Sequence, residues 1–267
     1  MKKTLALLFV LGFVSASYLR VIEPVPQTID GGGELDLGVM GPGQKLELVA
    51  NRGTGVTAAG WSGGEARWDQ IGFTTLSPGW SSEDSKVYEQ PMRAYLEADR
   101  NAADGVYYAE LTAWDEYEGA PTTKFRIKVE IRSDLLGSEL LTPNVVAGAN
   151  QPARFQFILK NDSNAGDAYE ILVSGLPGQW PAKKVFVPYH STKTVSYEVG
   201  SSERGDYAVN FSITSISSEK IKSENAGKLS VRTNLFLDML ATSHGVLLFP
   251  SIEQPIYSLL GLFANFK

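Results

Sequence analysis

Apolar and polar residues alternate with a period of two through much of the chain between residues 18 and 233. Segment 124–132 shows this most clearly, because every second residue is Phe, Ile or Val and those between are Lys, Arg or Glu. A strand with one face buried and one face in water has this pattern. We therefore expect short antiparallel strands separated by turns, and no sustained helix. Four further segments alternate in the same way: 154–160, 169–173, 195–199 and 207–213.

The chain also repeats itself at a spacing of about 100 residues. Leu-Ser-Pro-Gly-Trp at 76–80 returns as Leu-Pro-Gly-Gln-Trp at 176–180, and the leucine and tryptophan of each motif lie 100 residues apart. Asp-Gly-Val-Tyr at 104–107 returns as Arg-Gly-Asp-Tyr at 204–207. Two motifs at one spacing and in one order indicate two copies of the same unit.

Two weaker matches extend the repeat in both directions. Downstream, the apolar positions 125, 127, 129 and 131 are matched with 229, 231, 233 and 235. Upstream, Gly-Pro-Gly-Gln at 41–44 matches Gly-Ala-Asn-Gln at 148–151, where the offset rises to 107. We therefore expect extra residues in the first copy, in the glycine-rich stretch 51–70.

The strand count predicts the fold class. Six or seven short antiparallel strands in about 100 residues are typical of an immunoglobulin-like β-sandwich. The predicted architecture is all-β, with two tandem immunoglobulin-like sandwiches over residues 18–134 and 135–234. Tyr107 and Tyr207 each open a long strand after glycine, which favours a tyrosine corner, in which the hydroxyl bonds to an upstream loop. An ordinary core tyrosine is the alternative at either position.

Residues 140–232 resemble a known immunoglobulin-like module. The features that carry the resemblance are Lys-Asn at 160–161, Asp-Ala-Tyr at 167–169, Gly-Leu-Pro-Gly-Gln-Trp at 175–180 and Gly-Asp-Tyr-Ala-Val at 205–209. This module is found in archaeal S-layer-like cell-surface proteins and beside the carbohydrate-binding domain of some α-galactosidases. The resemblance implies an extracellular accessory or adhesive role with no active site to transfer. The first copy resembles the module less closely because of its insertion 51–70.

The first 16 residues predict export. Lys2 and Lys3 precede an apolar run at 5–14, and Val-Ser-Ala at 14–16 is a sequence that signal peptidase accepts. We expect a signal peptide at 1–16 and an extracellular or cell-surface location on an archaeal or bacterial cell. The chain has no cysteine, so disulfides and thiolate metal sites are excluded, and its two histidines cannot form a three-histidine zinc site.

Charge is distributed unevenly between the two predicted domains. Residues 17–134 carry 11 basic and 19 acidic residues, whereas residues 135–267 carry 11 of each. An acidic first domain repels nucleic acid and anionic membranes, so we expect no nucleic-acid partner. No phosphate loop or dinucleotide fingerprint occurs in the sequence, and we expect no cofactor.

Tryptophans are the first candidates for ligand contacts. Trp80 and Trp180 occupy equivalent places in the two copies, which favours packing. Trp61 and Trp68 lie in the insertion 51–70, and glycine-rich loops at the end of a sandwich often bind ligands. We predict Trp61, with Trp68, as an exposed ligand contact; a loop folded back on its own domain is the alternative.

Acidic residues at a predicted hairpin tip are the second candidates. Asp115, Glu116 and Glu118 precede Gly-Ala-Pro at 119–121 and could bind a calcium ion with help from another loop. The alternative is a solvated tip. Asn161 and Asn210 each begin an Asn-x-Ser sequon, so both are candidate glycosylation sites, and we expect both to be exposed.

Residues 235–267 do not fit the repeat. Pro255 could begin a helix whose apolar stripe includes Ile256, Leu259, Leu260 and Phe263. Twelve helical residues rise about 18 Å, which is shorter than the hydrocarbon core of a bilayer at about 30 Å. We expect this tail to pack on the second domain, to make a peripheral membrane contact, or to bind a partner.

These observations predict a non-catalytic protein of the cell surface or envelope with a structural or adhesive role. Its partners would be other envelope proteins or surface glycans. The alternative is a secreted carbohydrate-binding accessory protein that uses the insertion 51–70. A secreted hydrolase that uses Asp115 and Glu116 is a third hypothesis.

Overall fold

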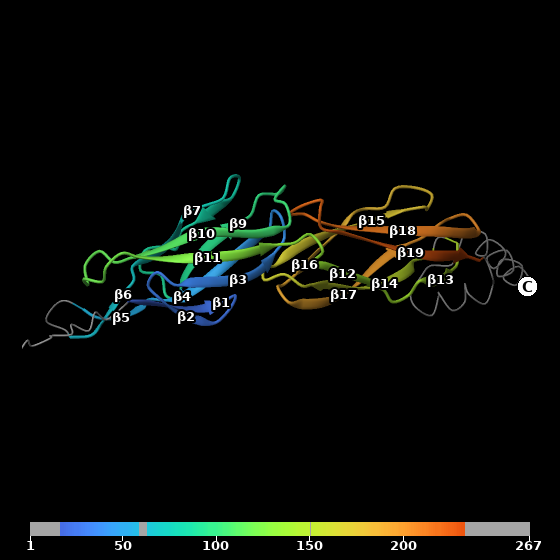
Figure 1. The fold of residues 1–267 in the computed structure, drawn as a ribbon. Coiled ribbons are helices and arrows are strands. Elements are labelled where there is room, and N and C mark those ends of the chain that lie inside the picture. The colour runs from blue at the N-terminus through green and yellow to red at the C-terminus, as the bar shows by residue number, and fades with distance from the viewer. Residues whose placement is uncertain (1–16, 59–62, 150, 233–267) are drawn as a thin grey trace, which may run out of the picture. The chain divides into compact units, whose positions relative to one another are not determined.

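The structure, a computed structural model, describes residues 17–58, 63–149 and 151–232. The chain divides into two compact units, Met1–Arg132 with Ser163–Ala165 and Ser133–Asp162 with Gly166–Lys267. The predicted signal peptide, Trp61 and the tail 235–267 lie outside the described residues. Every regular element in the described ranges is a β-strand, which confirms the all-β fold class (Figure 1).

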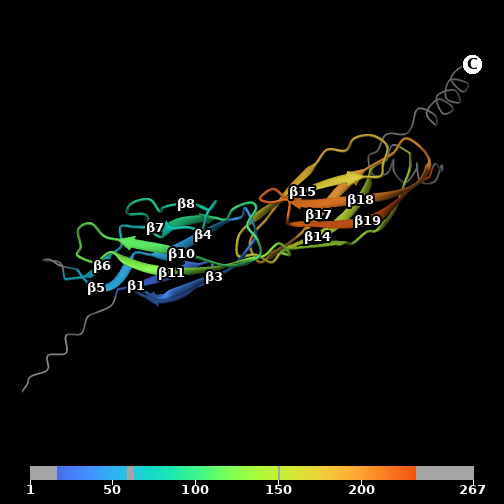
Figure 2. The same cartoon turned by 45° about the horizontal axis from the view of Figure 1, so that its top comes forward.

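The first unit is a sandwich of two sheets, which Figures 1 and 2 show from two directions. One sheet has the order β2-β1-β4-β9-β8, and the other has the order β3-β11-β10-β7. All neighbours are antiparallel except β3 and β11, which are parallel. The strands of the first sheet are β1 (Tyr18–Glu23), β2 (Gln27–Asp30), β4 (Lys45–Asn51), β8 (Ser81–Glu83) and β9 (Met92–Glu97). Those of the second are β3 (Glu34–Met40), β7 (Gln70–Thr75), β10 (Gly105–Trp114) and β11 (Thr123–Ile131).

The second unit has the same plan. Its sheets have the orders β12-β14-β17 and β13-β19-β18-β15-β16, with β13 and β19 parallel. The strands of the three-stranded sheet are β12 (Leu136–Leu140), β14 (Ala153–Asn161) and β17 (Ser191–Val199). Those of the five-stranded sheet are β13 (Asn144–Ala147), β15 (Asp167–Ser174), β16 (Lys183–Val187), β18 (Gly205–Ser215) and β19 (Lys222–Val231).

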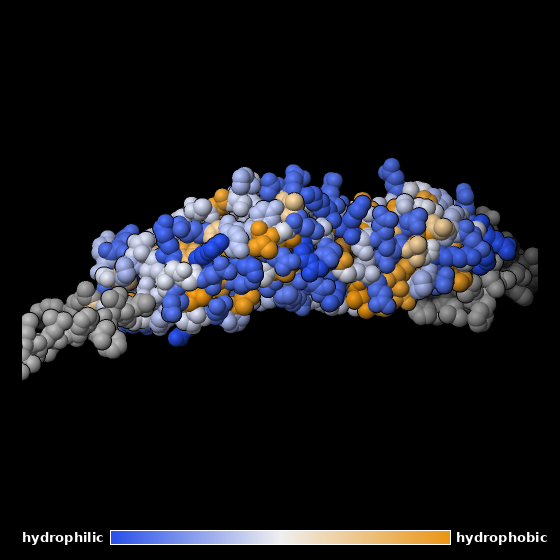
Figure 3. All heavy atoms as spheres, viewed as in Figure 1, coloured by the Kyte–Doolittle hydropathy of each residue, from blue (hydrophilic) through white to orange (hydrophobic). Residues whose placement is uncertain are grey.

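The alternation of apolar and polar residues determines which side chains form each hydrophobic core. In β11 the apolar residues from Phe125 to Ile131 are buried, while the charged residues between them are exposed or partly exposed. Phe155, Phe157 and Phe211 fill the second core, and their rings meet at centroid distances of 5.0 and 4.7 Å. Hydrophilic residues predominate on the face shown in Figure 3, with separate apolar patches. In the part of the chain that the structure describes, no helix is long and apolar enough to cross a bilayer.

The repeat is confirmed in detail at two turns. Gly41 N donates to Gln44 Oε1 at 2.7 Å, and Gly148 N donates to Gln151 Oε1 at 3.3 Å. In both turns the glutamine N–H donates back to the glycine carbonyl. The tyrosine corner is also confirmed in both units, because Tyr107 and Tyr207 donate to carbonyls four residues earlier.

One part of the predicted repeat is wrong. The sequence match placed residue 125 against 229, an offset of 104. In the structure Val129 lies opposite Tyr107, and Leu229 lies opposite Tyr207, so the offset remains 100. The alternation in this strand continues for many residues, so a slip of four preserves the pattern of buried and exposed faces. Pairing with the preceding strand determines the register.

The two units differ in three places, the first being β2, which has no counterpart in the second unit. The insertion in the first unit forms a two-stranded hairpin, β5 (Gly53–Thr57) and β6 (Glu65–Arg67), whereas five residues join β14 to β15 in the second. The strand after the repeated tryptophan also changes sheet: β8 pairs with β9, but β16 pairs with β15.

Candidate functional site

Three connections meet at one end of the first unit. Ala50 pairs with Met92, Trp114 with Gln70, and Ala113 with Thr123. The segments 52–69, 84–91 and 115–122, which we call the loop end, therefore leave the sandwich at the same end. Figure 1 shows the β5–β6 hairpin and the β10–β11 tip together there. In immunoglobulin-like sandwiches, loops gathered at one end commonly form the binding surface.

Asp69 connects all three segments. Its N–H donates to Trp114 O at 2.8 Å, and its carbonyl accepts from Tyr88 N at 2.8 Å. Its carboxylate accepts from Glu116 N at 2.9 Å and from Arg52 Nη2 at 2.9 Å. One buried residue thus fixes the backbone of three loops that are distant in sequence.

Arg52 completes this connection. Its side chain is 12% exposed and that of Asp69 is 4% exposed, so the ion pair is largely shielded from water. Arg52 Nε also donates to Trp68 O at 2.6 Å, and the guanidinium lies 5.3 Å from the ring centre of Tyr88. Burying a charge is costly unless the charge is paired and hydrogen-bonded, and both conditions hold here.

The acidic tip has a structural role in its own loop. The Asp115 carboxylate accepts hydrogen bonds from Tyr117 N, Glu118 N and Ala120 N at 3.0, 2.9 and 2.8 Å. Burial raises the pKa of the Asp115 carboxyl, but these backbone N–H groups outweigh burial and lower the pKa below its ordinary value of 3.8.

The other two acids of the tip do not complete a metal site. Glu118 Oε2 accepts from Arg67 N at 2.7 Å, and Glu116 is exposed. Among the described residues no group of three acids or histidines could hold a metal ion. The metal hypothesis for Asp115, Glu116 and Glu118 stays a prediction. In the structure the first carboxylate closes its own loop, and the third connects that loop to the hairpin.

Trp68 is likewise a core residue and not a ligand contact. Its side chain is fully buried, and its Nε1 donates to Tyr18 O at 3.1 Å. A ring with no exposed face cannot stack on a ligand, so the expectation for Trp68 is corrected. The burial of Ala66 beside it shows that part of the insertion folds back onto the sandwich. Trp61 lies outside the described residues, so its predicted role stays a prediction.

Two tyrosines that the sequence did not single out are exposed at the loop end. Tyr117 is 79% exposed and Tyr88 is 52% exposed. Tyr88 has φ of 61°, a left-handed conformation that costs a non-glycine residue about 1–2 kcal/mol. The hydrogen bond from Tyr88 N to Asp69 O helps to maintain this conformation. Strain of this kind in an exposed aromatic residue is characteristic of functional loops.

The sequence carried little signal for this surface. Asp69 reads as an isolated acid between Trp68 and Gln70, and nothing in the pattern links it to Arg52 or Tyr88. The pattern placed the insertion 51–70 and the tip at 115–118 in loops, but it gave no signal for segment 84–91.

The two sequons differ in accessibility. Asn161 is fully buried, and its Nδ2 donates to the carbonyls of Val187 and Pro188 at 3.3 and 3.2 Å, so the expectation that it is exposed is wrong. The last residue of a strand can be covered by a neighbouring connection. Asn210 is exposed on β18, as expected from its alternation with Val209 and Phe211. Ile256, Leu259, Leu260 and Phe263 lie outside the described residues.

No protein-family model matches the chain, and a search of curated proteins finds no match. Among solved structures, the chain is similar to the CARDB domain of a Pyrococcus furiosus protein in complex with di-metal ions. The TM-score is 0.27 at 13% identity, covering 37% of this chain and 90% of that one. It is also similar to the Yersinia pseudotuberculosis adhesin InvE, with a TM-score of 0.30 at 12% identity, covering 73% and 56%. The chain is similar as well to the D0-D1 domain of intimin, with a TM-score of 0.25 at 9% identity, covering 73% of this chain and 94% of that one.

At these values the solved structures carry no argument about what the chain binds. The observed topology and the two tyrosine corners define the class: the chain is built of two immunoglobulin-like β-sandwich units.

Proposed function

We propose that this chain is a non-catalytic, exported protein of the cell surface or envelope with an adhesive or spacer role, and that the loop end of the first unit is its binding surface. The observation that carries the proposal is that exposed aromatic rings stand on loops whose backbones are held by buried hydrogen bonds and an ion pair. The ion pair is Arg52–Asp69, and the rings are those of Tyr88 and Tyr117.

The physical argument concerns the entropy of binding. Tyrosine offers a large amphipathic contact surface with only two side-chain torsions, so it loses little freedom on binding. Because Asp69 and Asp115 hold the loop backbones through six hydrogen bonds, ordering those loops adds little further cost. A surface prepared in this way favours adhesion.

The same contacts support a non-catalytic role. Asp69 and Asp115 are engaged by backbone N–H groups and by Arg52, and Glu118 by Arg67 N. A general acid or base needs a carboxylate that can exchange a proton with a substrate. These carboxylates stabilise loops instead. The apolar run at 5–14 supports export, and the partners that we expect are envelope proteins or surface glycans.

A binding assay tests the surface. The mature chain should bind envelopes isolated from the producing organism, and the double variant Tyr88→Ser/Tyr117→Ser should weaken that binding roughly tenfold or more, as expected for two aromatic anchors. Tyr108→Ser is the matched control, since Tyr108 is exposed to 46% but lies within β10 and away from the loop end. Equal binding by the double variant and the control would refute the assignment.

Cell fractionation tests the location. The full chain should accompany the envelope, and a chain ending at Leu235 should be released into the medium if the tail anchors it. Recovery of both chains in the cytoplasm would contradict the proposal.

The carbohydrate-binding alternative makes a separate prediction. The β5–β6 hairpin carries the insertion at the loop end, so glycan-array binding that Trp61→Ala abolishes would favour this alternative.

A further inference from the structure

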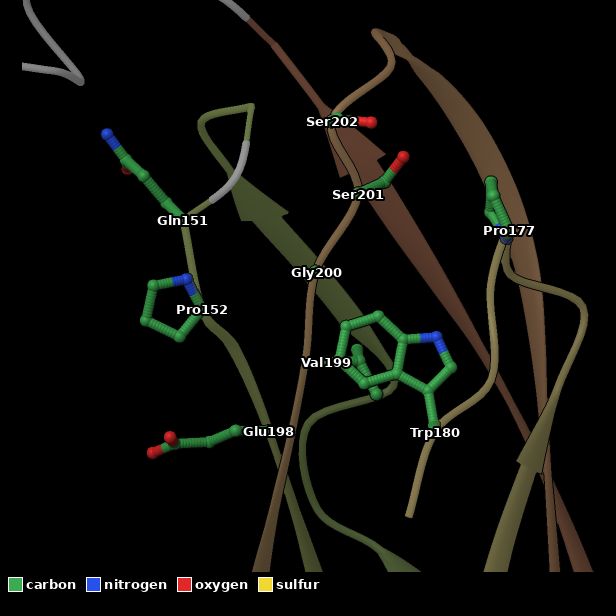
Figure 4. A pocket seen from close by; sticks show the side chains of 9 residues that line it. All are labelled: Gln151, Pro152, Pro177, Trp180, Glu198, Val199, Gly200, Ser201 and Ser202. Carbon is green, nitrogen blue, oxygen red and sulfur yellow. The ribbon is translucent and has the colours of Figure 1, made fainter. Parts of the chain in front are cut away.

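The second unit contains a cavity that plays no part in the function proposed above. It has a volume of about 440 Å³, within the range of about 300–1,000 Å³ typical of small-ligand sites. Figure 4 shows Trp180 and Pro177 on one side, Pro152 and Glu198 on the other, and Gly200 and Ser202 along the β17–β18 connection. We call this cavity the Trp180 pocket.

Two small residues open the Trp180 pocket. In the first unit Lys45 and Glu97 face each other where β4 begins. Gln151 is the equivalent of Gln44, so Pro152 is the equivalent of Lys45. Ala153 pairs with Val199, so Gly200 takes the place of Glu97 opposite Pro152. A Cβ atom on Gly200 would lie 3.1 Å from Gln151 O and 3.9 Å from Trp180 Cη2. The absence of a side chain there leaves the tryptophan bordered by open space.

The pocket contains polar groups without partners. Trp180 Nε1 is buried and has no hydrogen-bond partner among the described residues. Glu198 Oε1 accepts from Arg154 Nε and Nη2 at 2.9 and 2.7 Å. Within the described part of the chain, Glu198 Oε2 and Ser202 Oγ make no hydrogen bond. Buried polar groups in native proteins are normally paired, so an unpaired indole N–H requires an explanation.

We propose that the Trp180 pocket binds a neutral saccharide. The apolar C–H face of a sugar ring suits the flat surfaces of Trp180, Pro152 and Pro177, since the aromatic face is electronegative. The ring hydroxyls can donate to Glu198 Oε2 and exchange hydrogen bonds with Ser202 Oγ. A neutral ligand is favoured because Glu198 repels phosphate and carboxylate groups, and Arg154 is already paired with it.

A saccharide also suits the shape of the pocket better than a peptide does. Proline-rich peptides bind grooves lined by several aromatic rings. The Trp180 pocket has one aromatic ring and is compact, so it is matched to one or two sugar rings.

Titration of the ¹⁵N-labelled mature chain with neutral oligosaccharides tests the proposal. The probes are di- and trisaccharides of glucose, galactose, mannose and N-acetylglucosamine, and the readout is the indole N–H signals. At least one sugar should shift the signal assigned to Trp180, which is identified by its loss in Trp180→Phe. The signals of Trp68 and Trp80 should remain unchanged.

Variants separate a binding role from a packing role. Trp180→Ala should weaken binding of that sugar at least tenfold, and Glu198→Gln about threefold to tenfold. Trp80→Ala is the matched control, since Trp80 is the equivalent residue of the first unit, and it should bind normally. Glu198 is half exposed, so Glu198→Gln tests the site even if Trp180→Ala does not fold.

Three outcomes would overturn the proposal: no sugar shifts the Trp180 signal at millimolar concentration, a proline-rich peptide shifts it and no sugar does, or Glu198→Gln and Trp180→Ala bind as well as Trp80→Ala. The Tyr88→Ser/Tyr117→Ser variant should bind the sugar normally, so failure at the loop end and failure at this pocket are distinguishable.

Discussion

The indole ring of Trp80 packs on the ring of Tyr107, with 5.3 Å between the ring centroids. Tyr107 is the corner tyrosine of the first unit, and its hydroxyl donates to Ala103 O at 2.9 Å. In the second unit Tyr207 donates to Glu203 O at 3.0 Å, and its hydroxyl lies 3.2 Å from Ser201 Oγ. Both units therefore close the start of β10 or β18 with the same hydrogen bond but support the ring with different neighbours.

We expect Tyr107→Phe and Tyr207→Phe each to lower the free energy of unfolding by about 1 kcal/mol, the net value of one intramolecular hydrogen bond. Urea titration of each variant measures the change. Tyr108→Phe, which removes an exposed hydroxyl, should change the stability by less than about 0.5 kcal/mol. Unfolding midpoints that do not move in either corner variant would show that the corner contributes nothing.

Asp69→Ala should destabilise the first unit by about 3–5 kcal/mol, because it leaves Arg52 as a shielded charge without a partner. Replacing both partners, as in Arg52→Met/Asp69→Leu, should cost less than Asp69→Ala alone. Thermal unfolding measures both variants, and amide hydrogen exchange should show faster opening of Tyr88 and Glu116. A double variant less stable than the single one would contradict this account.

The first unit should lose stability in acid. The pKa of Asp115 is lower in the folded state than its ordinary value of 3.8, so the folded state binds this proton less readily than the unfolded state. The contribution of Asp115 is therefore present above about pH 4 and is lost as the pH falls through the lower folded value. Asp115→Asn should flatten the pH dependence of unfolding between about pH 5 and 2. An unchanged pH profile in this variant would refute the assignment.

Alanine substitutions at Gly175 and Gly178 distinguish the cost of a positive φ from the cost of a steric clash. Their φ values are 89° and 88°, so alanine meets the same conformational penalty of about 1–2 kcal/mol at either position. A Cβ on Gly175 would also lie 2.0 Å from Ala208 O, whereas a Cβ on Gly178 meets nothing within 4 Å. We expect Gly175→Ala to be destabilising by several kcal/mol more than Gly178→Ala in urea unfolding. Equal losses of stability in the two variants would show that the positive φ alone causes the destabilisation.

Asn161→Ala should destabilise the second unit by about 1–3 kcal/mol, because the buried carbonyl of Val187 loses its side-chain donor. Asn210→Ala, on the exposed face of β18, should stay within about 0.5 kcal/mol of the parent. Mass spectrometry of the protein from a glycosylating host should find glycan at Asn210 and not at Asn161. Modification of folded protein at Asn161 would contradict its burial.

The tertiary structure decided the chemistry of particular side chains. The Asp69 carbonyl and the Tyr88 N–H meet only because β7 and β9 bring their preceding loops to one end of the sandwich. The burial of Asn161, the packing of Trp68 and the cavity beside Trp180 likewise depend on what lies across from each residue, often many positions away in the chain.

The sequence by itself determined the elements and their repetition. A period of two dictates which face of each strand is buried, and the Gly-x-Tyr spacing at 105–107 and 205–207 predicts both corners. Such signals are local, because each depends only on residues that are close together along one strand or turn. The register of Leu229, the environment of Asn161 and the partners of Asp69 depend on pairing between separate segments. That pairing exists only once the sheets have formed, since cross-strand contacts join residues that are far apart in the sequence and that no local pattern relates to each other.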